Sequence, residues 1–157
     1  MASLTTNKNF LSPVGFQFKI SSNNYPNLEY FATACTLPGF NLDSVASPYR
    51  GVNLALTGDR INFDELGLRI NVTENFENYI ETFNWMHNII NNKGADEDYK
   101  ADATLLVLTS HNNVSKEIKF NGIFPTALSA LEFDTQLESV DYLQADVQFS
   151  YTNFEIS

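Results

Sequence analysis

Strict alternation of apolar and polar residues predicts β-strands at the start, middle and end of the chain. Phe16, Phe18 and Ile20 alternate with polar neighbours, and the same period of two runs through residues 66–72 and 143–152. Because successive side chains of a strand point to opposite faces, each run buries one face and leaves the other in solvent. The pattern therefore predicts amphipathic strands that share a core.

Less regular runs add further strands. Residues 30–36 are rich in β-prone types and end at the turn-forming sequence Leu37-Pro38-Gly39. Residues 103–109 and 114–124 flank a polar turn and indicate a hairpin. Pro125 has no N–H to donate, so we expect it to break the ladder.

A long excursion separates the second and third of these strands. Turn-forming residues fill most of the segment from Phe40 to Arg60, yet the alternation of Val52, Leu54 and Leu56 returns within it. This combination indicates a protruding hairpin at about residues 41–59.

One segment changes to a helical period. Apolar side chains and one histidine recur at spacings of three and four residues. This spacing predicts a helix at about Thr73–Asn91 with one apolar face. The residues of this face are Phe76, Ile80, Phe83, His87 and Ile90. Thr73 is the expected N-cap, Glu74 and Glu77 complement the helix dipole, and Gly94 lies just past the expected end.

These elements define the expected fold class. Several antiparallel strands with a single helix predict an α+β domain, a mostly antiparallel β-sandwich or barrel with the helix on its flank. We find no internal repeat or linker, so residues 1–157 are expected to form a single domain. Residues 93–102 are acidic and are expected to form a mobile loop.

Composition narrows the function. The chain has 157 residues, 43% of them hydrophobic, and a formal net charge of −10. A protein that grips nucleic acid needs the opposite sign, because its cations replace the counterions of the phosphates. Only 18% of residues are charged, and the uncharged polar surface that replaces them is less costly to bury in an assembly.

Cysteine content and hydropathy bear on location. Cys35 is the single cysteine, so no intrachain disulfide can form, and we expect it to be buried. No apolar run reaches the ~18 residues of a membrane span, and the first residues lack the apolar core of a signal peptide. The expected location is the cytosol, including that of a host cell.

Catalytic and metal-binding patterns are absent from the sequence. His87 falls on the helical stripe and His111 in a turn, which favours a core or surface role for each. The acidic run Asp96-Glu97-Asp98 lacks the ligand spacing of a calcium loop. We therefore expect no enzyme activity, cofactor or metal, with a small acidic binding domain or enzyme as the alternative.

The order of several short motifs resembles the tail tube family of contractile-tailed bacteriophages. The motifs are residues 16–20, 32–39, 57–60, 81–86 and 116–126, followed by the alternating C-terminal strand. Together they extend from about Phe16 to Ile156, nearly the whole chain.

The resemblance implies a structural role. It implies a small β-sandwich or barrel with a flanking helix, assembled into sixfold rings whose strands join into one inner barrel. The hairpin at residues 41–59 corresponds to one that reaches the next ring, and the candidate contacts between rings are Tyr49, Arg50, Asp59 and Arg60. Aromatic and arginine side chains are frequent interface hot spots.

The resemblance also implies a lumen through which DNA passes without specific binding. A wall of carboxylates and amides repels phosphate instead of retaining it. The candidate lumen residues are on the polar faces of two late strands: Glu132, Asp134, Gln144, Asp146 and Gln148. The alternative that these residues face the outside stays open.

Implied partners are further copies of the chain in stacked hexameric rings and the tail sheath, tape measure and baseplate proteins, without membrane insertion. The implied location is the tail of the virion, assembled in the host cytoplasm. A baseplate tube initiator, a tube terminator and the tube subunit of a contractile injection or type VI secretion system share the implied fold, and they remain alternatives.

Overall fold

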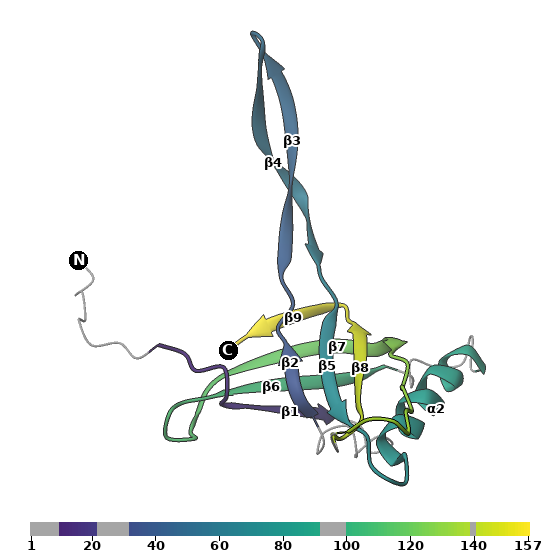
Figure 1. The fold of residues 1–157 in the computed structure, drawn as a ribbon. Coiled ribbons are helices and arrows are strands. Elements are labelled where there is room, and N and C mark those ends of the chain that lie inside the picture. Colours follow the sequence, from purple (N-terminus) through teal and green to yellow (C-terminus); the bar gives the residue numbers. More distant parts are fainter. Residues whose placement is uncertain (1–9, 22–31, 92–99, 139–140) are drawn as a thin grey trace.

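The computed structural model describes residues 10–21, 32–91, 100–138 and 141–157. These residues form two antiparallel sheets, which share one strand. They also form a long two-stranded hairpin and one helix (Figure 1). Sheet I consists of β1 (Phe16–Ser21), β6 (Ala101–Leu108), β7 (Val114–Leu128) and β9 (Asn153–Ile156). Sheet II consists of β2 (Ala32–Thr36), β5 (Leu66–Asn71), β8 (Gln144–Ser150) and the C-terminal part of β7. The expected α+β class is confirmed.

The shared strand bends where it passes from one sheet to the other. Gly122 adopts a φ of 65°, which is the left-handed region that glycine tolerates best. Pro125 does not break the ladder, contrary to expectation, because β7 continues to Leu128 and pairs with β8. A register shift between Pro125 and Ala127 accommodates the missing N–H as a β-bulge.

The hydrophobic core lies between the two sheets. The three alternating runs place their apolar side chains in it as expected, including Ile20 from β1, Leu68 from β5 and Val147 from β8. The largest side chains at its centre are Trp85, Phe120 and Phe149, each almost completely buried. Period-two alternation therefore identified the buried face of each strand.

The helix begins later than expected. Helix α2 spans Glu77–Asn91, and Phe76 before it has a φ of 59°. The Thr73 hydroxyl still accepts a hydrogen bond from the Glu77 backbone N–H at 3.1 Å, although Thr73 lies outside the helix. The left-handed conformation at Phe76 separates Glu74 from the first turn, so only Glu77 occupies it.

The buried face of α2 is also not the expected one. Ile80, Phe83 and Ile90 are 47%, 49% and 62% exposed, while the residues that face the core are Asn78, Thr82 and Trp85. The buried side chains have the same helical spacing, and two of them are polar. Their polar groups are satisfied locally, since Asn78 Nδ2 donates to the Asn71 carbonyl and Thr82 Oγ1 donates to the Asn78 carbonyl.

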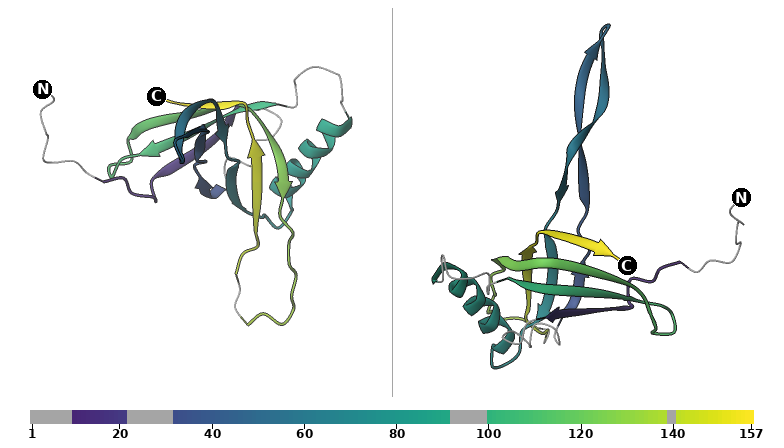
Figure 2. Two further views of the ribbon diagram at one scale, coloured as in Figure 1. Left: turned by 90° about the horizontal axis from the view of Figure 1, so that it is seen from above. Right: turned by 180° about the vertical axis from the view of Figure 1, so that it is seen from behind.

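The hairpin consists of β3 (Phe40–Tyr49) and β4 (Val52–Phe63), which pair only with each other within the described part of the chain. It projects from the sheets and continues the direction of β2 and β5 (Figures 1 and 2). We call the end of sheet II that lies opposite the hairpin the far end. It comprises residues 72–77 and 128–138.

Three expectations concern the remaining segments. Glu132 and Asp134 lie in the loop that follows β7 and not on a strand face, because the ladder ends at Leu128. In the acidic segment 93–102, Ala101 and Asp102 belong to β6, and residues 93–99 lie outside the described residues. Of the strand expected at residues 30–36, residues 30 and 31 also lie outside the described residues.

Candidate assembly surfaces

The tip of the hairpin is a two-residue turn. Arg50 and Gly51 have φ values of 46° and 80° between the paired residues Tyr49 and Val52, which is the pattern of a type I′ turn. Asn-Gly or Asp-Gly is the sequence that such a turn favours, because a positive φ is costly for an arginine. The guanidinium of Arg50 lies 5.5 Å from the centroid of the Tyr49 ring. An arginine in this strained position is typical of a functional residue.

The apolar side chains of the hairpin form two separate surfaces. The cross-strand pair Leu42–Ile61 and the cross-strand pair Val45–Leu56 point to opposite faces of the ribbon. The reason is that the two residues on each strand are an odd number of positions apart. We call these two faces the base face and the tip face. The base face consists of Phe40, Leu42, Ile61 and Phe63, and the tip face of Val45, Tyr49, Val52, Leu54 and Leu56.

The aromatic rings of the base face pack on the body of the protein, whereas Leu42 and Ile61 are 57% and 53% exposed. The Phe63 ring lies 5.4 Å from the Phe154 ring and 5.9 Å from the Tyr151 ring, measured between centroids. The Tyr151 hydroxyl donates a hydrogen bond to the Asp64 carbonyl at 2.7 Å, and burial together with the Asp64 carboxylate raises the pKa of Tyr151. These contacts anchor the hairpin at its base.

The tip face is exposed along its whole length, with side chains that are 47% to 63% exposed. A two-stranded ribbon is at most marginally stable in water, and Pro48 and Asn53 on its other face add little apolar surface. Exposed aliphatic and aromatic side chains at the end of a projecting ribbon are typical of a protein–protein interface.

The structure separates the four residues expected to contact the next ring. Tyr49 and Arg50 lie at the tip, whereas Asp59 and Arg60 lie midway along β4, where the register shifts. Sequence reasoning did not single out Leu54 and Leu56 as contacts, although their alternation had already placed them on one face.

The outward face of sheet II carries three of the expected lumen residues. Gln144, Asp146 and Gln148 alternate with buried neighbours along β8 and point away from the core. Asp146 Oδ1 accepts a hydrogen bond from Arg69 Nε at 2.8 Å, and this bond, followed by the charge of Asp146, raises the pKa of Arg69. Gln144 donates to Asn71 at 3.1 Å. This face is therefore polar and nearly charge-balanced.

Glu132 and Asp134 lie instead at the far end of sheet II, in a loop with exposed apolar residues. Asp134 Oδ1 accepts the Gln136 backbone N–H at 2.9 Å and so stabilises a turn. Phe133 and Leu137 are 72% and 66% exposed, and the Phe133 ring lies 6.3 Å from that of Phe76. No periodic pattern marks this loop, so sequence reasoning missed these two side chains.

A third apolar surface lies on helix α2. A groove of about 300 Å³ is lined by Tyr79, Phe83, Met86, His87, Ile90 and Leu128. The ring centroids of Phe83 and His87 are 4.4 Å apart, so this histidine belongs to an apolar surface patch and not to the core.

Within the described ranges, no group of three or more His, Cys, Asp or Glu residues could hold a metal ion. Cys35 points inward from β2, and burial raises the pKa of its thiol to about 12. None of the helices in the described part of the chain is long and apolar enough to cross a bilayer.

No protein-family model and no curated protein matches the chain. Three solved structures resemble its fold over nearly its whole length. They are the tube-terminating cap of the anti-feeding prophage (TM-score 0.72, 15% identity, covering 99% of this chain and 95% of that chain), the sheath–tube complex of the extracellular contractile injection system PVC (0.67, 16%, 99% and 99%) and the 6-fold symmetrised baseplate of the anti-feeding prophage (0.65, 15%, 100% and 97%). The fold implied by the sequence resemblance, that of contractile tail tube proteins, is thereby confirmed.

Proposed function

We propose that the chain is a structural subunit of a contractile tail tube, in which sixfold rings stack into a hollow tube through which DNA passes into the host cell. The observation that carries this proposal is the projecting hairpin with its exposed tip face, because such a ribbon needs a partner. The likeness to tube, cap and baseplate structures supports the same conclusion. In this role the protein is not an enzyme and needs no cofactor.

The edges of sheet II support ring formation. Among the described strands, β2 pairs with β5 alone, so its outer edge offers backbone groups for a further strand. Strand directions alternate along β2, β5, β8 and β7. A contact between β2 of one copy and residues 124–128 of β7 in the next would continue this antiparallel order, and closing the ring would remove both edges.

The same arrangement makes sheet II the wall of the lumen. The hairpin continues the direction of β2 and β5, so a hairpin that reaches the next ring brings sheet II alongside the tube axis (Figure 1). Gln144, Asp146 and Gln148 then face the lumen, where amides and an ion pair give phosphates little to bind. We place the protein in the virion tail, assembled in the host cytoplasm, with sheath, tape measure and baseplate proteins as partners.

Three other roles fit the same fold. The likeness to a tube-terminating cap favours a terminator as the second candidate, and that to a baseplate favours an initiator. The likeness to the sheath–tube complex of a contractile injection system favours, as a further alternative, the tube subunit of such a system, with a protein as cargo instead of DNA.

Negative-stain electron microscopy of the purified protein over a concentration series tests the proposal. Long hollow tubes are expected of a repeating subunit, single rings that never stack would indicate an initiator or terminator, and a monomer at every concentration would contradict assembly. Arg50→Asn is the matched variant, because it supplies the Asn-Gly sequence that a type I′ turn favours. We expect this variant to fold at least as stably as the wild type and to form shorter or fewer tubes.

A further inference from the structure

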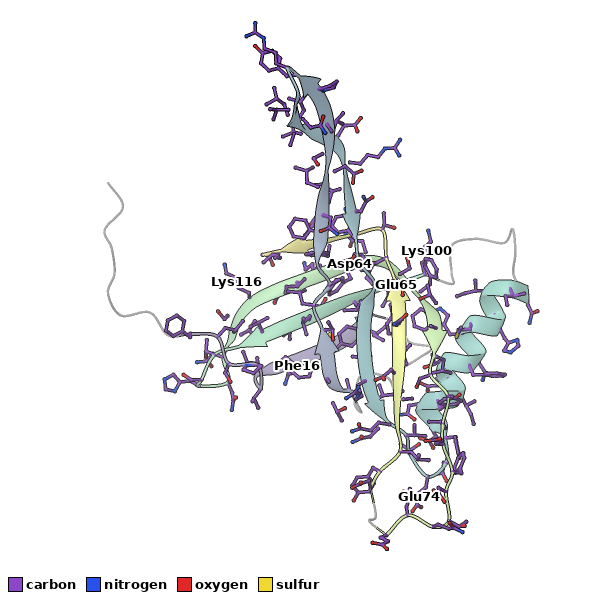
Figure 3. The ribbon with its side chains drawn as sticks, turned by 45° about the horizontal axis from the view of Figure 1, so that its top comes forward. Phe16, Asp64, Glu65, Glu74, Lys100 and Lys116 are labelled. Atoms are coloured by element: carbon purple, nitrogen blue, oxygen red, sulfur yellow. The ribbon has the colours of Figure 1, made fainter. Side chains whose placement is uncertain are left out.

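Beyond the ring itself, the far end of sheet II is a second candidate contact surface. Asp64 and Glu65 mark the base of the hairpin and Glu74 the opposite end of the molecule (Figure 3). At that opposite end, Phe133 and Leu137 expose most of their side-chain surface. Large apolar side chains exposed this far in a loop are costly unless something covers them.

The charge of the far end is opposite to that of the hairpin tip. Residues 72–77 and 128–138 contain five acidic residues and no lysine or arginine, namely Glu74, Glu77, Glu132, Asp134 and Glu138. The tip carries Arg50 beside Tyr49, and its other polar neighbours are uncharged. Opposite charge beside matching apolar surfaces favours association between two such surfaces.

In a stack of identical rings, the hairpin tip of one ring faces the far end of the next. Rings stacked in one orientation make a heterologous contact, in which two different surfaces of the subunit meet and the assembly stays open-ended. The hairpin and the far end occupy opposite ends of the strands of sheet II, so the hairpin end of one copy approaches the far end of a copy in the next ring.

We propose that the tip face of the hairpin docks on the far end of a second copy of this chain. Tyr49, Val52 and Leu54 cover Phe133 and Leu137, and Arg50 lies among the carboxylates of the far-end loop. This inference rests on the proposed tube. It assigns Glu132 a role in the contact between rings.

Disulfide trapping tests the pairing. In a Cys35→Ala background, Val52→Cys is combined with Leu137→Cys. We expect covalent dimers and higher ladders on a non-reducing gel after mild oxidation of assembled tubes. The matched control is Asn53→Cys with Leu137→Cys, since residue 53 lies at the same height on the opposite face of the ribbon.

The outcomes separate the two proposals. If tubes form but the Val52 pair is trapped no more than the Asn53 pair, the docking inference is wrong and the tube proposal stands. Trapping of Val52→Cys by Phe83→Cys, in the groove of α2, would likewise overturn it in favour of that groove. If no stacked rings form at all, the tube proposal fails and the docking inference with it.

A charge exchange provides a second, independent test. Arg50→Glu is expected to raise the protein concentration needed for stacking by about tenfold or more. Glu132→Arg in the same chain should restore at least part of this loss, because the pair is rebuilt with reversed signs. Equal defects in the single and double variants would contradict a contact between residues 50 and 132.

Discussion

Gly58 on β4 crosses Asp43 on β3 so closely that a Cβ atom at residue 58 would lie 2.7 Å from the Asp43 carbonyl carbon and 2.9 Å from its Cβ. Side-chain carbons do not approach so closely, and the obstruction is largely backbone, which cannot move aside. This crossing coincides with the register shift that separates the base face of the hairpin from its tip face.

We expect Gly58→Ala to twist the hairpin and misdirect its tip. The protein concentration required for stacking should rise by about tenfold or more. The urea midpoint of the body should stay unchanged, because residue 58 lies outside the core. Gly67→Ala is the control, since its Cβ would make only an ordinary 3.6 Å contact with Thr36. Normal tubes from Gly58→Ala would show that the crossing does not orient the tip.

The two faces of α2 predict opposite effects of substitution. Trp85→Ala removes a fully buried ring that packs 5.9 Å from the Phe149 ring, and it should lower the free energy of unfolding by about 3–5 kcal/mol. Phe83→Ser, on the exposed face, should cost less than about 1 kcal/mol. Urea unfolding followed by circular dichroism measures both, and a larger loss from Phe83→Ser would restore the face that helical periodicity predicted.

Cys35 predicts a decrease in stability at alkaline pH. Burial raises the pKa of its thiol from 9.0 to about 12, so the unfolded chain releases this proton at lower pH than the folded protein does. The stabilisation is complete below pH 9 and is lost as the pH rises toward 12, at up to about 1.4 kcal/mol per pH unit. Urea unfolding at pH 8 and pH 10 measures it.

Because other groups also titrate in this range, the Cys35→Ala variant is the reference for that measurement. Its stability should decrease less between the two pH values than that of the wild type. Parallel decreases in the two proteins would mean that Cys35 ionises as readily in the folded protein as in the unfolded chain.

The proposed lumen position of sheet II gives its ion pair a testable effect on DNA. Asp146→Asn leaves the Arg69 guanidinium exposed without its carboxylate partner, so tubes of this variant should retain a labelled DNA duplex in a salt-dependent manner. Wild-type tubes and tubes carrying both Asp146→Asn and Arg69→Gln should release it. Retention measured by co-sedimentation at low and high salt distinguishes them. Equal release by all three tubes would contradict the assignment of this face to the lumen.

The sequence predicts those core residues that follow a periodic hydrophobic pattern, and it does not predict the others. Ile70 and Val147 are core residues because every second side chain of a strand faces inward, and alternation is visible without a structure. Asn78 was missed for the opposite reason: a buried amide is stable only because Asn71 and its neighbours offer backbone partners, and hydrophobic periodicity cannot register that.

The candidate contact surfaces divide in the same way. Leu54 and Leu56 form an alternating run, and their odd spacing from Ile61 already places them on the opposite face of the ribbon, but which of the two faces contacts the body is revealed only by the structure. Phe133 and Leu137 lie in a loop, where no period distinguishes a surface residue from a buried one. The alternating pattern indicated the fold class and the hairpin, and the resemblance implied the same fold, whereas the geometry of each contact required the structure.

The continuity of the hairpin with sheet II also determines how the molecule bears a load. A pull on the tip along the hairpin acts along β2 and β5, parallel to the strands and perpendicular to the hydrogen bonds that join them. Under such a shearing force the bonds of a strand pair must fail together, whereas a sideways pull would open them one at a time. The subunit is therefore strongest against a pull along the hairpin, which in the proposed tube is the direction of stretching when the two ends of the tube are drawn apart.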